Sequence, residues 1–324
     1  MNDQLRERIA LINDRIATLK YGEEPNELYE PIRYIMSLGG KRMRPLLVLL
    51  AYELFKDDSD SVLDQAIAVE VFHNFTLMHD DIMDEAPLRR GKPTVHEKWD
   101  ENVAILSGDV MLVKAYDMLL EAPGGLKAII KAFNDCAAGV CEGQQFDMNF
   151  ESLPTVAEDT YINMIRLKTA VLLGFSLKLG AMLAGTSEED AERLYNFGVS
   201  IGIGFQLKDD LLDVYADQEK FGKQVGGDII SNKKTFLLLK ALELANANQK
   251  EKLDRWLAAE DFDKAEKVAA VTAIYDEIGI RQLTLDKMNQ WFDKGFHALN
   301  ELVAADERKA PLKAFTQYLI NREK

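Results

Sequence analysis

Residues 187–215, SEEDAERLYNFGVSIGIGFQLKDDLLDVY, decide the fold class of this chain. Ser187 and Asp190 form a helix-starting pair, and the residues after them keep helical periodicity as far as about Tyr215. A helix of nearly 30 residues is much longer than the mean of about 11–12 residues. Helices of this length must lie side by side to bury their apolar faces, so the stretch predicts a helical bundle.

Two other stretches have the same character. Thr155 and Glu158 read as a capping box, which predicts a helix from there to about Ala184, closed by Gly185. Residues 61–84 are equally uninterrupted, and no segment alternates convincingly as a strand would. The short breaks indicate turns between helices, namely Gly39-Gly40, Ala122 to Gly125 and Phe221 to Gly227.

Composition supports a globular all-α protein. The 324 residues are 47% hydrophobic and 29% charged, and only 20 Gly and 8 Pro are available for the tight turns of an all-β protein. Length alone would suggest about two domains. Because no linker or low-complexity tract divides the chain, we expect instead one domain over residues 1–324. The part after about Gln249 carries no motif, and we expect it to supply packing, surface and part of a lid.

Charge and targeting signals narrow the partners and the compartment. The net charge of −15 argues against nucleic acid or an anionic membrane surface as the main partner. The N-terminus lacks the pattern of a signal peptide, and the apolar run Leu46 to Tyr52 is too short to cross a bilayer. Cys136 and Cys141 form neither a disulfide framework nor a zinc site, and we expect both to be buried. The sequence therefore predicts a cytoplasmic protein that is not an integral membrane protein.

Two aspartate clusters share the spacing Asp-Asp-x-x-Asp. Their members are Asp80, Asp81, Asp84, Asp209, Asp210 and Asp213. One such run alone is usually solvated surface. Both clusters adjoin strongly apolar helix, however, and carboxylates inside a bundle need cations or protons. If the two helices face each other, the six carboxylates suit Mg²⁺, which accepts one or two of them, keeps waters and completes its shell with phosphate. The motifs of zinc sites and P-loops are not found.

Basic residues accompany these clusters. Lys41 and Arg44 stand three apart at a helix start, where backbone N–H groups also attract anions. The other candidate cations are Arg89, Arg90, Lys168, Lys223 and Lys233. Any one of them could simply be solvent-exposed, as we expect for Arg42 and Lys234. As a set beside two metal motifs, they suit the binding of two diphosphates.

The order of these motifs resembles that of the trans-prenyl diphosphate synthases of the farnesyl and geranylgeranyl type. The resemblance runs from about Leu38 to Thr235. It rests on the two aspartate motifs and on the segments Gly40–Pro45, Leu88–Gly91, Gly143-Gln144-x-x-Asp147, Lys168-Thr169, Phe205–Asp210 and Gly222-Lys223. It implies an all-helical fold around a central cavity, a homodimer, three Mg²⁺ ions, and condensation of isopentenyl diphosphate with dimethylallyl, geranyl or farnesyl diphosphate.

The resemblance also implies a role for each matching residue. The Mg²⁺ ions that bridge the allylic diphosphate would be bound by Asp80, Asp81, Asp84 and Asp209, and metal-bound water would be oriented by Asp210 and Asp213. That diphosphate would be contacted by Arg89, Lys168 and Lys233, and closed over by Lys223. Isopentenyl diphosphate would be held by Lys41, Arg44, His73 and Arg90. The allylic cation would be steadied by Thr169, Gln206 and the backbone near Lys168.

The histidines and the product length leave alternatives open. A lone histidine on an apolar helix is usually a core group, but the position of His73, seven residues before Asp80, favours the diphosphate role. His79 we expect to be structural. Phe75 lies about 7.5 Å up the helix from Asp80, where a growing chain would extend. An aromatic Phe75 beside a small Thr76 resembles geranylgeranyl (C20) more than farnesyl (C15) synthases, although Phe75 could be an ordinary core residue.

Three other functions compete with this one. A class I terpene cyclase would share the bundle and the first motif, but its second metal motif normally carries Asn and Ser or Thr. A non-catalytic subunit of a prenyl synthase would be expected to have lost one motif, and both are intact. A purely structural helical protein would have no reason to place six aspartates beside apolar helix.

Overall fold

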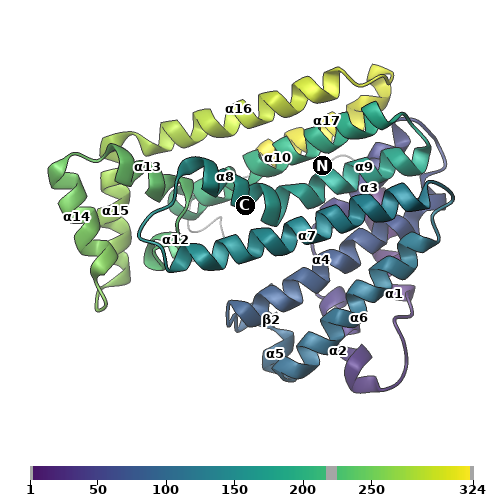
Figure 1. Ribbon diagram of the computed structural model, residues 1–324, viewed down its shortest axis with the longest axis horizontal. Helices are drawn as coiled ribbons and strands as arrows, with labels where there is room; N and C mark the ends of the chain where they lie inside the picture. The colour runs from purple at the N-terminus through teal and green to yellow at the C-terminus, as the bar shows by residue number, and fades with distance from the viewer. Residues whose placement is uncertain (1–2, 217–224, 322–324) are drawn as a thin grey trace. The chain divides into compact units, whose positions relative to one another are not determined.

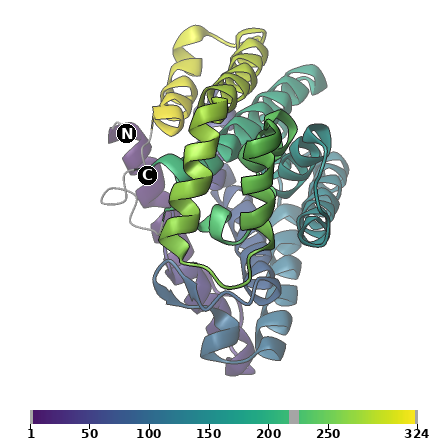
Figure 2. The same cartoon turned by 90° about the vertical axis from the view of Figure 1, so that its left-hand side faces the viewer.

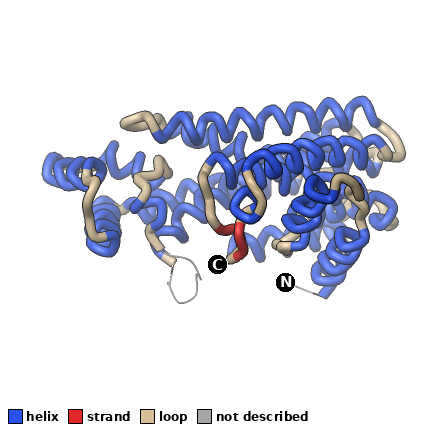
Figure 3. Tube along the Cα trace, turned by 90° about the horizontal axis from the view of Figure 1, so that it is seen from below, coloured by secondary structure: helices blue, strands red, loops and turns tan. Residues whose placement is uncertain are grey.

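The computed structural model describes residues 3–216 and 225–321. Within those residues almost all regular structure is helical, and the two strands form one short hairpin (Figure 3). The hairpin pairs β1 (Leu88–Arg89) with antiparallel β2 (Lys92–Pro93). The prediction of an all-α fold is confirmed.

The chain divides into two compact units, each built from separate stretches of sequence. Unit 1 lies within residues 1–136, 172–195 and 302–315, and unit 2 within residues 137–171, 196–301 and 316–324. Three helices supply several residues to both units, namely α7 (Leu126–Glu151), α10 (Glu188–Tyr215) and α17 (Asp306–Asn321), and α9 (Val171–Ala184) has only its first residue in unit 2. A single domain over the whole chain stays a prediction.

Unit 1 contains most of the N-terminal helices (Figure 1). Its elements besides the hairpin are α1 (Asp3–Thr18), α2 (Asn26–Ser37), α3 (Met43–Glu53), the 3-10 turn η1 (Ser59–Val62), α4 (Leu63–Met83), α5 (Val95–Lys98), α6 (Glu101–Leu120), α9 (Val171–Ala184) and parts of α7, α10 and α17. Helix α4 confirms the long helix expected over residues 61–84.

The core of unit 1 forms around α3, which is buried from Pro45 to Tyr52. A helix that is apolar on all sides must be surrounded by other elements, and α4 is one of those that pack against it. Phe133 lies at the centre of an aromatic cluster in the same unit. Its ring centroid is 5.1 Å from that of Phe72 and 5.6 Å from that of Phe175. These rings fix α4, α7 and α9 against one another within the unit.

Unit 2 contains the C-terminal helices. Its elements are α8 (Glu158–Ile165), the π-helical turn η2 (Arg166–Ala170), α12 (Gly227–Ile230), α13 (Phe236–Leu244), α14 (Ala247–Ala258), α15 (Lys264–Ile278), α16 (Ile280–Asn300) and the remaining parts of α7, α10 and α17. Helices α13 to α16 lie next to one another, coloured green to yellow-green (Figures 1 and 2). Buried side chains of α10, α12, α13, α14 and α15 form one hydrophobic cluster there.

The helix expected between Thr155 and Ala184 is present, but it starts and continues differently. It begins at Glu158 after Ala157, and the structure shows no side-chain cap, so the predicted capping box is wrong. Glu158 instead forms ion pairs with Lys240 and Lys287, both at 2.6 Å. Halfway along, the backbone widens into the π turn η2, where the Val171 N–H donates to the Arg166 carbonyl. Such single π turns occur frequently at functional sites.

The stretch Glu158–Ala184 is also long and apolar enough to cross a membrane by length and composition, and it is the one such helix among the described residues. Of its most apolar window, 78% is buried inside the protein, as in a core helix. No uninterrupted apolar run in the sequence marks this helix, because Lys168 and Lys178 divide it.

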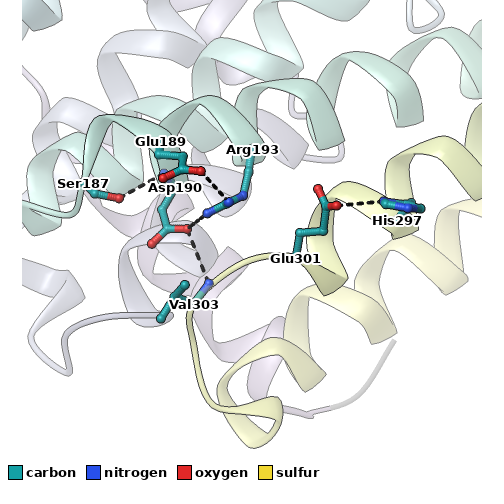
Figure 4. A network of polar contacts seen from close by, with 7 residues as sticks. All are labelled: Ser187, Glu189, Asp190, Arg193, His297, Glu301 and Val303. Atoms are coloured by element: carbon teal, nitrogen blue, oxygen red, sulfur yellow. Dashed lines mark hydrogen bonds and ion pairs between the residues drawn. The ribbon is translucent and has the colours of Figure 1, made fainter.

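Helix α10 begins where the sequence predicts, because Ser187 Oγ accepts a hydrogen bond from the Asp190 N–H at 3.1 Å (Figure 4). Asp190 in turn accepts bonds from Arg193 at 2.9 Å and from the Val303 N–H at 3.4 Å. Asp190 thereby joins the start of α10 to the segment that precedes α17 in unit 1. In unit 2, His297 makes a solvent-exposed contact of 3.6 Å with Glu301 (Figure 4).

The cysteines follow the prediction only in part. Cys136 is buried on α7, and its burial raises the pKa of the thiol far above the usual range. Cys141 is exposed, so the expectation that both are buried is wrong. Five residues on an α-helix correspond to about 500° of rotation, which turns the second side chain well away from the first.

Candidate active site in two cavities

A cavity of about 380 Å³ in unit 1 gathers the cations expected to hold isopentenyl diphosphate. Its walls are formed by Gly40, Lys41, Arg42, Met43, Arg44, Glu70, His73 and Arg90. The structure thus brings together all four residues of that predicted set, Lys41, Arg44, His73 and Arg90. Four cations face one acid, Glu70, among the residues that line this cavity. Such a cavity suits a multiply charged anion.

Two turns shape this cavity. The Gly39-Gly40 turn leads into α3, and Arg90 occupies the left-handed region at φ +53° in the hairpin turn. Arg90 donates a hydrogen bond to the Gly39 carbonyl, which ties the two turns together. Lys41 lies just before the N-cap residue Arg42, and Arg44 lies in the first turn of α3, where N–H groups without helical partners add to the positive potential.

Burial sets the protonation of the groups in this cavity. Burial and the surrounding arginines hold the pKa of His73 well below its usual value, so the imidazole is neutral at pH 7. Burial also lowers the pKa of Arg44 to about 10, which still leaves its guanidinium charged. Arg44 Nε is buried and has no hydrogen-bond partner among the described residues. A buried donor of this kind is costly unless a ligand or water accepts from it.

Arg42 contradicts the expectation of a solvent-exposed side chain. It is only 3% exposed, and its guanidinium lies 2.7 Å from Glu70 Oε1, which is equally buried. Arg42 stands between two cations of the predicted site, Lys41 and Arg44. Nothing in the sequence pattern indicates that its partner is an acid 28 residues away. Lys234, the other cation expected to be exposed, is half-buried.

The first aspartate cluster ends α4, and its members differ in burial. Asp81 is buried and accepts three hydrogen bonds from Arg89, at 2.6 to 2.9 Å. Asp80 is half-buried, whereas Asp84 caps the helix C-terminus and is exposed. Arg89 therefore lies against the metal motif itself, in a bidentate arrangement that is typical of strong Arg–carboxylate pairs.

Phe75 is buried one turn before this cluster. Its ring lies 4.7 Å from that of His79 and 5.6 Å from that of Phe72, measured between centroids. His79 fits against α6 at Gly108, and its Nε2 lies 3.2 Å from the Ile105 carbonyl oxygen. These contacts support the expected structural role of His79. The hydroxyl of Thr76 donates to the His73 carbonyl at 2.8 Å.

A second cavity, of about 100 Å³, lies in unit 2 and gathers the residues expected around the allylic substrate. Its walls are formed by Asp147, Tyr161, Met164, Ile165, Lys168, Thr169, Gln206, Asp210, Lys233 and Thr235. Lys168, Thr169, Gln206, Asp210 and Lys233 are all members of the predicted site. Asp147, Tyr161 and Thr235 had no role assigned to them.

Close backbone contacts place Lys168 and Thr169 in this cavity. A methyl group on Gly143 of α7 would lie 2.2 Å from the Lys168 backbone nitrogen, and one on Gly202 of α10 would lie 2.7 Å from the Ala170 Cα. Only glycine therefore allows both helices to approach the π turn. Lys168 Nζ donates to Asp147 at 2.6 Å, and Thr169 Oγ1 donates to Gln206 at 3.4 Å. Asp147 is the acid of the Gly-Gln-x-x-Asp segment, and in this structure it accepts the hydrogen bond from Lys168.

Asp210 is the most deeply buried acid of this cavity. It accepts hydrogen bonds from Tyr161 and from Gln206, the latter at 3.2 Å. Burial, with the nearby charge of Asp228, raises the pKa of Asp210 to about 7. Burial also raises the pKa of Asp228 to about 6. The buried Asp210 and the half-buried Asp228, both with raised pKa values, indicate that this region suits protons or cations.

The chain after α10 returns to this cavity. Asp213 Oδ2 accepts a hydrogen bond from the Asp228 N–H at 2.9 Å, which sets the start of α12. Asn232 follows at φ +55°, and its amide oxygen accepts from the buried Lys267 at 2.6 Å. Lys233 and Thr235 then line the cavity. Lys223 lies outside the described residues. Lys267 shows that the motif-free region after Gln249 helps to position this loop.

The carboxylates fit magnesium better than a metal that needs a full protein shell. Among residues 3–216 and 225–321, no three His, Cys, Asp or Glu side chains are gathered closely enough to hold a metal ion. Mg²⁺ needs only one or two carboxylates where water and phosphate complete its octahedral shell. Burial is the main reason for the raised pKa values of Asp210 and Asp228, and a bound cation would favour the charged form of both carboxylates.

Comparison with known proteins identifies the family of the chain. The polyprenyl synthetase family matches residues 25–275. Geranylgeranyl diphosphate synthase of Methanosarcina mazei is 37% identical over 99% of this chain and 98% of its own. Geranylgeranyl diphosphate synthase of Sulfolobus acidocaldarius is 34% identical over 100% and 99%. A crystal structure of geranylgeranyl pyrophosphate synthase superimposes with a TM-score of 0.92 at 43% identity, covering both chains completely. The chain therefore belongs to the polyprenyl synthetase family of trans-prenyltransferases.

Proposed function

We propose that the protein is a Mg²⁺-dependent short-chain prenyl diphosphate synthase that makes geranylgeranyl diphosphate (C20) in preference to farnesyl diphosphate (C15). Its substrates would be isopentenyl diphosphate and an allylic diphosphate. The observation that carries the proposal is the unit 1 cavity, in which Lys41, Arg44, His73 and Arg90 surround a space large enough for a diphosphate. The names of the full-length relatives support the C20 product.

The unit 1 cavity would hold isopentenyl diphosphate through its cations. Lys41, Arg44 and Arg90 would offset the charge of the diphosphate, and Arg44 Nε is a buried donor still in need of an acceptor. A neutral His73 would add a hydrogen bond without adding charge. Because the cations are supplied by the protein, this cavity needs no metal to bind its ligand.

The unit 2 cavity would hold the allylic diphosphate. Lys168 and Lys233 supply positive charge there. The family resemblance adds Arg89 and Lys223 to the set proposed for this group. Three Mg²⁺ ions, bound by Asp80, Asp81, Asp84, Asp209, Asp210 and Asp213, would add the charge that stabilises the departing diphosphate. Asp147 already accepts a hydrogen bond from Lys168, so metal ions would be needed in addition to the lysines of this cavity.

The reaction would break the bond between the allylic carbon and the diphosphate oxygen. The double bond of isopentenyl diphosphate would supply the electron pair of the new carbon–carbon bond, and a proton would pass from the isopentenyl unit to the departed diphosphate. Thr169 and Gln206 would steady the intermediate cation with their oxygens. Buried apolar residues such as Met164 and Ile165 would exclude water that could trap it.

Phe75 and Thr76 would set the product length. Phe75 is 9% exposed and is held from behind by Phe72 and His79, so its ring can act as a fixed floor. The smaller Thr76 would leave space beside it.

A homodimer in the cytoplasm completes the proposal. Helix α6 exposes Ile105, Leu106, Val113 and Leu120, each at least 42% exposed, and three of them recur every seven residues. A repeating apolar stripe of this kind suits a helical partner, here a second copy of the chain. The buried state of the one membrane-compatible helix supports a protein that is not embedded in a bilayer.

The decisive experiment is a product assay. The purified protein is incubated with isopentenyl diphosphate, Mg²⁺ and, in separate reactions, dimethylallyl, geranyl or farnesyl diphosphate, and the products are identified by mass. We expect C20 as the main product from each primer. Cyclic hydrocarbons would indicate a terpene cyclase, and elongation only after addition of another protein would indicate a subunit of a heteromeric synthase. No elongation under any of these conditions would reject the proposal.

A further inference from the structure

We infer that Arg42 and Glu70 form a positioning pair behind the isopentenyl diphosphate cavity. Arg42 would not bind the diphosphate, although it stands between Lys41 and Arg44 in the sequence. It would attach the turn that contains Lys41 and Arg44 to α4, the helix that contains His73. The inference rests on the proposed function, because it assigns the diphosphate to this cavity.

The guanidinium of Arg42 is fully engaged with the protein. Nη1 donates to Glu70 Oε1 at 2.7 Å, Nε to Asn13 Oδ1 at 3.0 Å and Nη2 to the Met36 carbonyl at 2.8 Å. Each of its three nitrogens therefore has an acceptor at good distance. Reorienting Arg42 toward a diphosphate would break all three bonds in a buried place, which is costly. Arg44 differs, since its Nε has no partner among the described residues.

The backbone of Arg42 begins helix α3. The residue sits in the left-handed region at φ +47°, and its carbonyl accepts the first helical bond from the Leu46 N–H at 3.2 Å. A non-glycine residue in this region needs contacts that hold it there. The three side-chain bonds are such contacts. They determine where the first turn of α3, and with it Lys41 and Arg44, enters the cavity.

Glu70 connects this turn to α4. It lies three residues before His73, so the two side chains are neighbours on one face of the helix. Asn74 donates to the Glu70 carbonyl at 2.8 Å. One buried ion pair, Arg42 with Glu70, thus sets the distance between the cations of the turn and the imidazole of His73.

The charges of the pair predict an unusual pattern of substitutions. Loss of Arg42 leaves an unpaired carboxylate in the wall of an anion-binding cavity, which repels the ligand as well as releasing the turn. Removing the Glu70 charge in the same protein relieves that repulsion. In the wild-type background, however, removal of the Glu70 charge only loosens Arg42. Glu70→Gln is therefore expected to be harmful alone and beneficial beside Arg42→Met.

The test uses Arg42→Met, Glu70→Gln and the double variant of the full chain, with steady-state kinetics for each substrate. We expect Arg42→Met to raise KM for isopentenyl diphosphate about tenfold or more, with KM for the allylic diphosphate changed less than about twofold. Glu70→Gln should raise the same KM about threefold, and the double variant should recover at least about threefold of the loss in Arg42→Met.

Arg15→Met is the matched control. Arg15 forms a bidentate pair with Asp64, at 2.7 and 2.8 Å, which also joins an N-terminal element of unit 1 to α4 but does not line the cavity. Both KM values should stay within about twofold of the wild type in this variant. If Arg42→Met does not fold, Arg42→Lys replaces it, because lysine keeps the charge but cannot make the three directed bonds.

Two results would overturn the inference. If Glu70→Gln lowers KM for isopentenyl diphosphate by the same factor in both backgrounds, Arg42 acts as a direct ligand. If both KM values change together with thermal stability, the pair is only a stabilising contact. Calorimetric titration of the wild type and the variants with isopentenyl diphosphate and with inorganic pyrophosphate compares their binding affinities without turnover. A wild-type protein that binds neither would instead reject the proposed function.

Discussion

The cavity of unit 1 is lined by four cations and one acid, whereas the smaller cavity of unit 2 is lined by two lysines and two aspartates. In the first, the single acid is bound to Arg42, which leaves an excess of positive charge for an anion. In the second, Lys168 is already bound to Asp147 and the buried Asp210 has a pKa near neutrality. We therefore expect the cavity of unit 1 to bind a diphosphate through protein cations alone, and the cavity of unit 2 to need added metal ions.

Removal of divalent metal tests this contrast with the largest expected effect. In excess EDTA, elongation should fall by about a thousandfold or more, because the departing diphosphate loses its stabilising charge. Calorimetric binding of isopentenyl diphosphate should stay within about threefold, because the unit 1 cavity uses its own cations. A parallel loss of elongation and of isopentenyl diphosphate binding would show that the two cavities do not differ in their need for metal.

Replacement of Lys168 separates the cavities at the level of one residue. Lys168→Met should lower kcat by about 10²- to 10³-fold, since the lysine is proposed to stabilise charge that develops in the transition state. The KM for isopentenyl diphosphate should change little. Lys178→Met, ten residues along the same continuous helix and paired with Glu192 at 2.5 Å, is the control and should keep normal kinetics. An unchanged kcat in Lys168→Met would remove Lys168 from the proposed machinery.

The raised pKa of Asp210 predicts how the metal-free protein responds to pH. The folded protein binds this proton more tightly than the unfolded chain, so the associated stability is complete below about pH 4 and is lost as pH rises through about 7. In EDTA, Asp210→Asn should therefore be more stable than the wild type at pH 8, by about 1 kcal/mol or more, with little difference at pH 4. Thermal unfolding at both values measures this. An equal difference at the two pH values would argue against a buried protonated carboxyl.

Phe75→Ala is expected to alter product length more than rate. Without the ring, the wall that Phe72 and His79 support should recede, and products longer than C20 should accumulate. Mass analysis of the products decides this, with kcat for the first condensation expected to stay within about threefold. An unchanged product distribution in Phe75→Ala would make Phe75 an ordinary core residue.

The fold class could be predicted from the sequence because helix period is a local property, and the residues of the two cavities were grouped through the family resemblance. The start of α10 at Ser187 and the extent of α4 follow directly from such patterns. The family resemblance grouped Lys168 with Thr169 and Gln206, and these three residues line one cavity. The start of α8 was predicted wrongly, because Glu158 is engaged by Lys240 and Lys287 instead of by the backbone of its own helix.

The remaining features depend on residues far apart in the chain. Arg42 was expected in solvent, since nothing next to it indicates that Glu70 will be its buried partner. Tyr161 and Lys267 belong to no motif, yet one donates to Asp210 and the other holds Asn232. The role of Asp147 could have been predicted, because it belongs to a segment that resembles a family motif. An acid in such a segment needs a basic partner, which here is Lys168. Long-range pairing of this kind becomes visible only once the helices are packed.

The π turn at Arg166–Ala170 has a consequence for insertions and deletions. A π turn holds one residue more than an α-helical turn of the same span. Deleting one residue there would turn it into ordinary α-helix and rotate everything on one side by about 100°. The helix would survive such a change, but Lys168 could no longer point where Asp147 lies. Length in this segment is therefore constrained as strictly as residue identity, even though a helix would tolerate the shorter chain.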